Sequence, residues 1–166
     1  LPFPVPLTRV SGNLLTDTAW TNTWDAENRL VTMTTNGQKL VFNYDWQGRR
    51  ISKTVSNWVS GAWVLASDLR FAYDGWNLIG VLDSGLARSN SYVWGLDLSG
   101  SLQGAGGVGG LLMDQNVGWG VTNFVAYDGN GNVMALVNAA DGTSSAQYEY
   151  GPFGGGPPGN GANGQG

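Results

Sequence analysis

Short stretches with apolar or aromatic residues at alternate positions, each followed by a turn residue, run along most of the chain. The segments "KLVFNY", "RFAY" and "SYVW" are examples, and they are followed by Asp, Asp and Gly. Such alternation places every second side chain on one face of a β-strand. No window of about 11 residues or more shows the spacing of an amphipathic helix. The pattern predicts an all-β protein with about a dozen strands.

An aromatic residue precedes most of the predicted turns, often with a second one two positions earlier. Because residues two apart on a strand share a face, the two rings of such a pair point the same way. Their recurrence at irregular intervals indicates copies of one repeating unit. We expect these side chains to stack repeat on repeat in an aromatic ladder, which comprises Trp24, Phe42, Tyr44, Phe71, Tyr73, Tyr92, Trp94, Tyr127, Tyr148 and Tyr150.

Two kinds of turn alternate along the repeats. In the first kind an Asp accepts backbone N–H bonds and a Gly or Asn three residues later takes the left-handed conformation. We assign the pairs Asp25 and Asn28, Asp45 and Gly48, Asp74 and Asn77, and Asp128 and Gly131 to this kind. The second kind is a two-residue hairpin signal, found at Asn36-Gly37, Ser60-Gly61, Ser84-Gly85 and Asp141-Gly142.

The alternation of these turns predicts an antiparallel meander of hairpin repeats, arranged as a β-solenoid or a curved-sheet wall. A tight hairpin at Ser60-Gly61 would place Trp58 opposite Trp63 as a cross-strand pair.

The composition narrows the chemistry that the chain can carry. Its 166 residues contain no Cys and no His, which removes thiol nucleophiles, imidazole bases and most zinc or haem ligation. The formal net charge of −4 and the pI of about 4.4 argue against a nucleic-acid partner. No apolar run reaches the roughly 18 residues of a membrane span. We therefore expect a protein that is not an enzyme, without catalytic residues, cofactor, metal site, nucleic-acid partner or membrane span.

Three short motifs offer competing chemistry. "VLDSG" places Asp83 in the local pattern of an aspartic protease, whose site needs two carboxylates, so one copy would act only across a dimer. "DGNGN" offers Asp128, Asn130 and Asn132 for weak calcium contact but lacks the Gly and the closing Glu of a calcium loop. "GAGGVGG" lacks the Lys-Ser/Thr of a phosphate loop. We interpret the first two as turns and the third as a flexible crossover between repeats.

The aromatic side chains also have a second interpretation. Exposed Trp and Tyr rings suit a carbohydrate-binding surface. The structural role is favoured, because burying one ring removes about 150–250 Å² from water, roughly 4–6 kcal/mol gross at about 25 cal/mol/Å². Arg49 and Arg50, which follow the Asp45 turn, are expected to project from opposite faces of the next strand.

The Tyr-Asp-x-x-Gly-Arg unit at Tyr44 to Arg49 resembles the YD, or RHS, repeats of bacterial Rhs proteins, of toxin-complex shell components and of teneurins. The segments Tyr92 to Leu112 and Tyr127 to Gly154 resemble the stretch that leads into the RHS-associated core. The resemblance implies a β-sheet wall that spirals into a hollow shell around a polypeptide cargo, often a toxin, outside the cell or at its surface. The self-cleavage motif of that family is not matched, because "GPFG" at 151–154 lacks the Asp.

We divide the chain into three parts on composition. Residues 1–19 are a Pro-rich N-terminal arm or edge-capping strand, 20–154 an RHS/YD-like β-repeat domain, and 155–166 a Gly/Pro-rich C-terminal tail. The alternating prolines of "LPFPVPL" would blunt one strand edge. The apolar residues between and after them would then act as an assembly arm: Phe3, Val5 and Leu7.

Open sheet edges on a short meander need a partner. The leading hypothesis is therefore a self-associating subunit of an extracellular or cell-surface filament, tube or shell wall, a homo-oligomer or polymer joined through sheet edges and terminal arms. One alternative is a fragment of a large Rhs shell with a polypeptide toxin as cargo. Another is a carbohydrate-binding surface with a glycan as partner. A third is an enzyme whose activity would be lost on changing Asp83.

Overall fold

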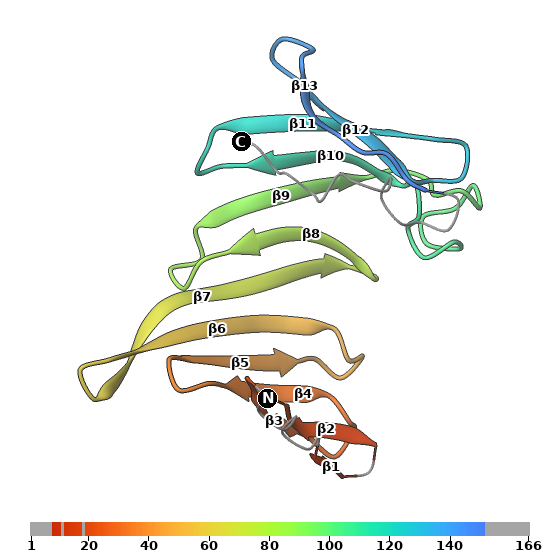
Figure 1. The fold of residues 1–166 in the computed structure, drawn as a ribbon. Helices are drawn as coiled ribbons and strands as arrows, with labels where there is room; N and C mark the ends of the chain where they lie inside the picture. The colour runs from red at the N-terminus through yellow and green to blue at the C-terminus, as the bar shows by residue number, and fades with distance from the viewer. Residues whose placement is uncertain (1–7, 11, 18, 152–166) are drawn as a thin grey trace. The chain divides into compact units, whose positions relative to one another are not determined.

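The computed structural model describes residues 8–10, 12–17 and 19–151. These residues form one 13-stranded sheet in which the strands follow one another in sequence order, so the predicted all-β antiparallel meander is confirmed (Figure 1). The strands are β1 (Thr8–Val10), β2 (Asn13–Thr16), β3 (Thr21–Trp24), β4 (Leu30–Thr34), β5 (Gln38–Tyr44), β6 (Arg50–Val59), β7 (Ala62–Asp74), β8 (Asn77–Leu82), β9 (Arg88–Trp94), β10 (Leu111–Asn116), β11 (Val121–Tyr127), β12 (Val133–Asn138) and β13 (Ser144–Gln147). None of the described residues belongs to a helix that could cross a membrane.

The strands fall into two compact units. The first contains the described residues up to Tyr73 together with Gly80–Ser89, and the second contains Asp74–Ile79 and the described residues from Asn90 onward. The predicted arm residues Phe3, Val5 and Leu7 and the tail at 155–166 lie outside the described residues.

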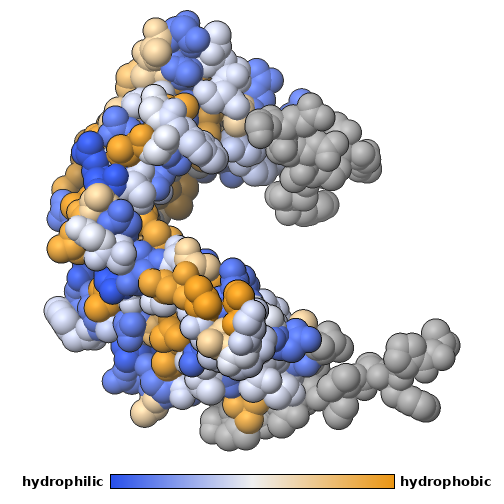
Figure 2. All heavy atoms as spheres, turned by 90° about the vertical axis from the view of Figure 1, so that its left-hand side faces the viewer, coloured by the Kyte–Doolittle hydropathy of each residue, from blue (hydrophilic) through white to orange (hydrophobic). Residues whose placement is uncertain are grey.

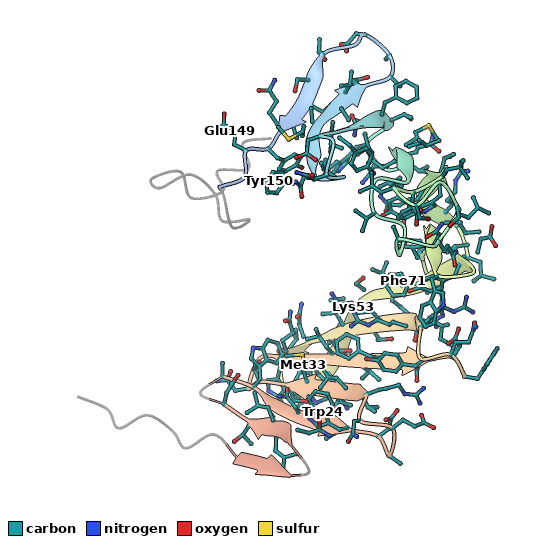
Figure 3. All side chains as sticks on the ribbon, turned by 90° about the vertical axis from the view of Figure 1, so that its right-hand side faces the viewer. Trp24, Met33, Lys53, Phe71, Glu149 and Tyr150 are labelled. Carbon is teal, nitrogen blue, oxygen red and sulfur yellow. The ribbon has the colours of Figure 1, made fainter. Side chains whose placement is uncertain are left out.

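Few apolar side chains are buried in either unit. Among the described residues, Phe42 and Val81 are the buried hydrophobic side chains, with 4% and 7% of their surfaces exposed. In the first unit Met33 lies opposite Leu40, and Leu40 opposite Val55, so apolar side chains continue from strand to strand on one face (Figure 3). Apolar and polar residues are interleaved on the surface (Figure 2). The sheet is therefore held largely by contacts between neighbouring strands.

The hairpin between β6 and β7 is the tight turn that the sequence predicts. Ser60 and Gly61 both have positive φ, 50° and 89°, as a two-residue turn that matches the twist of the strands requires. Trp58 lies opposite Trp63, with ring centroids 5.0 Å apart and an interplanar angle of 68°. This edge-to-face arrangement confirms the predicted cross-strand pair.

The prediction of a two-residue hairpin at Ser84-Gly85 is wrong. β8 ends at Leu82, and the turn starts at Asp83, whose N–H donates to Ala87 O at 2.9 Å. The Asp83 carboxylate accepts hydrogen bonds from the backbone N–H groups of Gly85 and Ala87 at 2.8 and 2.9 Å. These bonds start the turn one residue early, so the left-handed position falls on Leu86, with φ of 64°.

Leu86→Gly should stabilise the protein. The left-handed conformation costs a residue with a Cβ about 1–2 kcal/mol, and the larger unfolded-state entropy of Gly offsets part of the gain. Leu86 is 67% exposed, so little packing is lost. We expect the free energy of unfolding in urea to rise by about 0.5–1 kcal/mol.

Gly48→Leu is the reciprocal control. Gly48 has φ of 82° and open space where a Cβ would lie, so the substitution adds conformational cost without a clash. It should lower the free energy of unfolding by about 1 kcal/mol. A loss of stability in Leu86→Gly would contradict this account of the turn.

Candidate functional site

The Asp45 turn shows the local unit from which the sheet is built. Asp45 Oδ1 accepts hydrogen bonds from the N–H groups of Gln47 and Arg49, both at 2.9 Å, and Gly48 takes the left-handed conformation. Asp45 Oδ2 accepts from Arg49 Nε at 2.7 Å. Burial acts to raise the pKa of Asp45, but these hydrogen bonds and the charge of Arg49 outweigh it and hold the pKa below its ordinary value. One carboxylate thus closes the turn and orients the arginine.

The same geometry recurs at Asp25 and Asp128. In each turn Oδ1 accepts from the N–H groups two and four residues later, at 2.9–3.0 Å. The left-handed residue is Asn28 in one and Gly131 in the other. Arg29 Nε donates to Asp25 Oδ2 at 2.7 Å, whereas in the Asp128 turn Asn132 Nδ2 replaces the arginine at 2.8 Å.

A β-bulge stands next to each of these three turns. The strand register shifts at the aromatic residue directly before the Asp, so that Trp24 lies opposite Leu30, and Tyr44 opposite Arg50. Tyr127 likewise lies opposite Val133. A bulge adds one residue to one strand of a pair. Here the added residue lies on the strand after the turn and is Val31, Ile51 or Met134, opposite the strand that ends with the aromatic residue.

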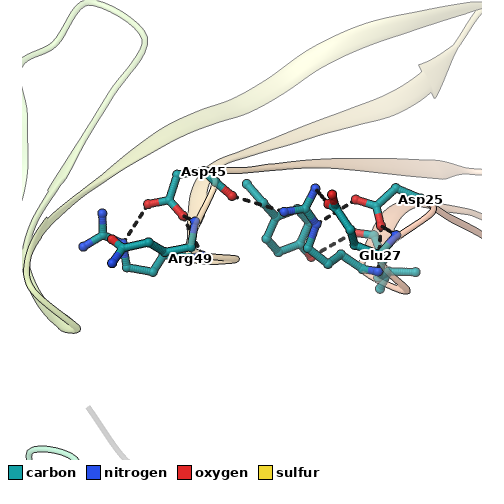
Figure 4. A network of polar contacts seen from close by, with 8 residues as sticks. Asp25, Glu27, Asp45 and Arg49 are labelled. Atoms are coloured by element: carbon teal, nitrogen blue, oxygen red, sulfur yellow. Dashed lines mark hydrogen bonds and ion pairs between the residues drawn. The ribbon is translucent and has the colours of Figure 1, made fainter.

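The aromatic side chain before the turn joins one hairpin to the hairpin before it. The Tyr44 hydroxyl, at the end of β5, donates to Leu30 O at the start of β4 at 2.8 Å. The Arg29 guanidinium lies over the Tyr44 ring, 5.2 Å from its centroid, and Arg29 Nη1 donates to Asp45 O at 3.1 Å. The arginine that is held by the Asp turn of one hairpin therefore packs over the aromatic ring of the next hairpin (Figure 4).

This hairpin joint, an aromatic side chain whose polar tip donates to a main-chain carbonyl of the preceding strand, repeats along both units. Arg49 lies over the Tyr73 ring at 5.2 Å, as Arg29 does over Tyr44. The joints are Trp24 Nε1 to Leu14 O (2.9 Å), Tyr44 to Leu30 O, Tyr73 to Arg50 O (3.0 Å), Trp94 Nε1 to Leu78 O (2.7 Å) and Tyr127 to Leu111 O (2.7 Å).

The structure places the predicted aromatic ladder differently from the stacking that we expect from sequence. Among the described residues, the one pair of rings in contact is Trp58 and Trp63, which are not ladder residues. Phe42 is buried beneath the Arg50 guanidinium, 4.6 Å from the ring centroid. Phe71 and Tyr92 are half-buried, and Tyr148 and Tyr150 are 42% and 45% exposed.

A signal for the joints is present in the sequence. The aromatic residue just before the turn is Tyr or Trp in all five joints, and these are the aromatic side chains with an O–H or N–H to donate. Phe stands at the other position of its pairs. Stacking alone would not distinguish the two positions, so this asymmetry indicates hydrogen bonding.

The assignment of Asp74 and Asn77 as turn residues is wrong. β7 continues through Asp74 and β8 begins at Asn77, which leaves Gly75 and Trp76 as the turn. Because Gly follows Asp directly, the positive φ (57°) falls at the first turn position and the connection shortens to two residues. Gln103 Nε2 donates to Asp74 O at 3.0 Å.

The connection between β9 and β10 is built around a buried carboxylate and is not the flexible crossover that we predict from "GAGGVGG". Asp97 is 5% exposed. Its Oδ1 accepts from the hydroxyl and N–H of Ser99 at 2.5 and 2.9 Å, and its Oδ2 accepts from the N–H groups of Ala105 and Gly107 at 2.6 and 3.2 Å. The Ser99 hydroxyl lowers the pKa of Asp97 most; burial opposes it, and the backbone donors bring the value to about 2.

The other candidate carboxylates also hold turns. Asp83, the residue of the aspartic-protease hypothesis, closes the β8–β9 turn described above. Asp128, the first residue of the calcium hypothesis, receives two N–H groups and the Asn132 amide. In the part of the chain that the structure describes, no group of three or more His, Cys, Asp or Glu side chains could hold a metal ion.

The sequence of this chain is similar to part of a known bacterial protein. The chain is 31% identical over 147 residues to a protein of Bacillus spizizenii named tRNA3(Ser)-specific nuclease WapA. The match covers 87% of this chain but 5% of the relative, so the chain spans a small part of the relative's length. No family model matches the chain.

Two predictions from sequence are corrected by these comparisons. The resemblance to RHS and YD repeats is not supported as family membership, because no family model matches. The prediction that the protein is not an enzyme is contradicted, because the matched relative is a nuclease by name.

Tyr44→Phe tests the hairpin joint. The substitution keeps the ring beneath Arg29 but leaves Leu30 O without its donor, so the free energy of unfolding should fall by about 0.5–1.5 kcal/mol. Tyr150→Phe is the matched control, because Tyr150 is exposed and its hydroxyl has no partner among the described residues; it should change stability by less than about 0.5 kcal/mol. Equal effects of the two variants, measured in urea, would contradict the joint.

The low pKa of Asp97 predicts a specific loss of stability in acid. A carboxylate whose folded pKa lies below its unfolded value stabilises the fold above the unfolded pKa, and loses that contribution as the pH falls through the folded pKa. For Asp97 the window runs from 3.8 down to about 2. Asp97→Asn should lower the midpoint of urea unfolding at pH 7. As the pH falls through this window, the midpoint of the variant should also decrease less than that of the wild type. An unchanged slope in the variant would show that other groups cause the acid sensitivity.

Proposed function

We propose that this chain is a wall-forming sheet segment of a longer polypeptide that carries a nuclease. The observation that carries the proposal is the similarity over 87% of the chain to a nuclease of which the chain spans 5%. A segment of that size, matched nearly end to end, fits a part of an extended repeat region.

The hairpin joints support the wall-forming role. The hairpins contact one another through the same interaction, an aromatic tip on a main-chain carbonyl, and at Tyr44 and Tyr73 an arginine also lies over the ring. A repeat that bonds mainly to its neighbours can be added many times without enlarging a common core. Such a sheet can be as long as the polypeptide requires.

A second candidate function is self-association into a filament, tube or shell wall. β1 and β13 end the strand order, so each has one neighbouring strand among the described residues. An unpaired strand edge presents N–H and C=O groups that another copy can bind. A head-to-tail contact that does not close would produce a filament. Both candidates include an extracellular or cell-surface location.

The mass of the native polypeptide distinguishes the two candidates. An antibody raised against this chain should detect, in culture medium or at the cell surface of the source organism, a polypeptide many times heavier than 17.5 kDa. The immunopurified polypeptide should cleave tRNA. A native species near 17.5 kDa that sediments as a polymer would favour self-association instead. A heavy polypeptide that leaves tRNA intact would contradict the nuclease part of the proposal.

A further inference from the structure

A hollow of about 630 Å³ lies on one face of the second unit, over β9 to β13. Its volume falls within the range of about 300–1,000 Å³ that is typical of small-molecule sites. The strand register brings the polar side chains that line the hollow together. Asp114 lies opposite Asn123, and Asn123 opposite Asn138, so these side chains form a row across β10, β11 and β12. Asn116 and Asn90, opposite one another, add a second row two residues away.

Three asparagines in the hollow use their amide oxygens within the protein. Asn116 Oδ1 accepts from the N–H of Trp119 at 3.0 Å, and Asn138 Oδ1 accepts from the N–H of Ala140 at 2.8 Å. Asn123, which is 6% exposed, accepts from the Ser145 hydroxyl at 2.7 Å. Because only the oxygen of an amide can accept, the two bonds from backbone N–H groups set the orientations of Asn116 and Asn138. The three Nδ2 groups have no hydrogen-bond partner among the described residues.

An unpaired acceptor stands in the same row. Asp114 Oδ1 is buried and has no hydrogen-bond partner among the described residues. Buried polar groups in native proteins are nearly always paired, and leaving one unpaired is costly. Asp114 also lines the hollow, so the hollow presents amide donors beside a carboxylate. A ligand that both donates and accepts hydrogen bonds would suit this arrangement.

An exposed indole lies at the rim. Trp119 is 82% exposed in the turn between β10 and β11, and its backbone N–H donates to Asn116 Oδ1. A flat, exposed ring beside convergent polar groups can cover the apolar face of a ligand while the polar groups bind its edges.

The charged side chains of the second unit disfavour an anionic ligand in the hollow. No Lys or Arg follows Arg88 in the sequence, so the second unit has no cationic side chain. Asp114 is the one charged residue that lines the hollow. A phosphodiester would be repelled by Asp114 and would find no cation to pair with.

We propose that this hollow binds a neutral oligosaccharide. Each sugar hydroxyl can donate and accept a hydrogen bond, which suits amide donors next to a carboxylate acceptor. The carbon face of a sugar ring would stack on Trp119. This inference is independent of the nuclease similarity and of the wall-forming role.

Calorimetric titration of the chain with cellotetraose, maltotetraose, laminaritetraose and chitotetraose, each at up to about 10 mM, tests the proposal. We expect at least one of them to bind at a single site with a Kd of about 1 mM or tighter. Trp119→Ala should weaken that binding by about tenfold or more, and Asp114→Asn should weaken it measurably. Trp46→Ala is the matched control, because Trp46 is 88% exposed in a turn of the first unit, outside the hollow.

Thermal melts followed by circular dichroism should show that Trp119→Ala folds as the wild type does, since the indole is almost fully exposed. The proposal is overturned if none of the four sugars binds, or if Trp46→Ala and Trp119→Ala weaken binding equally. It is also overturned if a single-stranded oligonucleotide binds through Trp119 more tightly than any of the sugars.

Discussion

A sheet with few buried apolar side chains must be held together by contacts between neighbouring strands. Phe42 and Val81 are the buried hydrophobic side chains among the described residues. The hairpin joints compensate: Tyr44 and Tyr73 each donate to the preceding strand beneath an arginine that an Asp turn holds in place. The turn, the bulge and the joint are consecutive in sequence, so one short segment both closes its own hairpin and attaches it to another.

The two units connect their hairpins with different side chains. In the first, arginines cover the rings of Tyr44 and Tyr73. The second has no Lys or Arg, and the Asn132 amide donates to Asp128 in its turn. The buried Asp97 organises the long connection between β9 and β10 through backbone donors. A cation-free unit whose amide donors have no partner among the described residues is suited to uncharged polar ligands.

The parts of the fold that were predictable from sequence are those decided by a few consecutive residues. The alternation in "KLVFNY" predicts a strand, and Ser60-Gly61 predicts the Trp58–Trp63 pair. Turn predictions based on the same short patterns fail where one residue differs. Gly75 directly after Asp74 shortens one turn, and Asp83 starts another turn one residue early. Gln103 and Asp74 are 29 residues apart, and the row of Asp114, Asn123 and Asn138 spans three strands. Such partners depend on the cumulative register, which each bulge shifts.

The central claim is that an Asp turn supports the next hairpin as well as its own. Native-state hydrogen exchange of Asp45→Ala, compared residue by residue with the wild type, tests it most directly. Removing the carboxylate takes away the hydrogen bond to Arg49 Nε that helps to hold this side chain over Tyr73. We predict loss of protection at the amides of Gln47 and Arg49 and also in β7 around Tyr73. Loss confined to residues 45–49, with β7 protected as in the wild type, would contradict the claim.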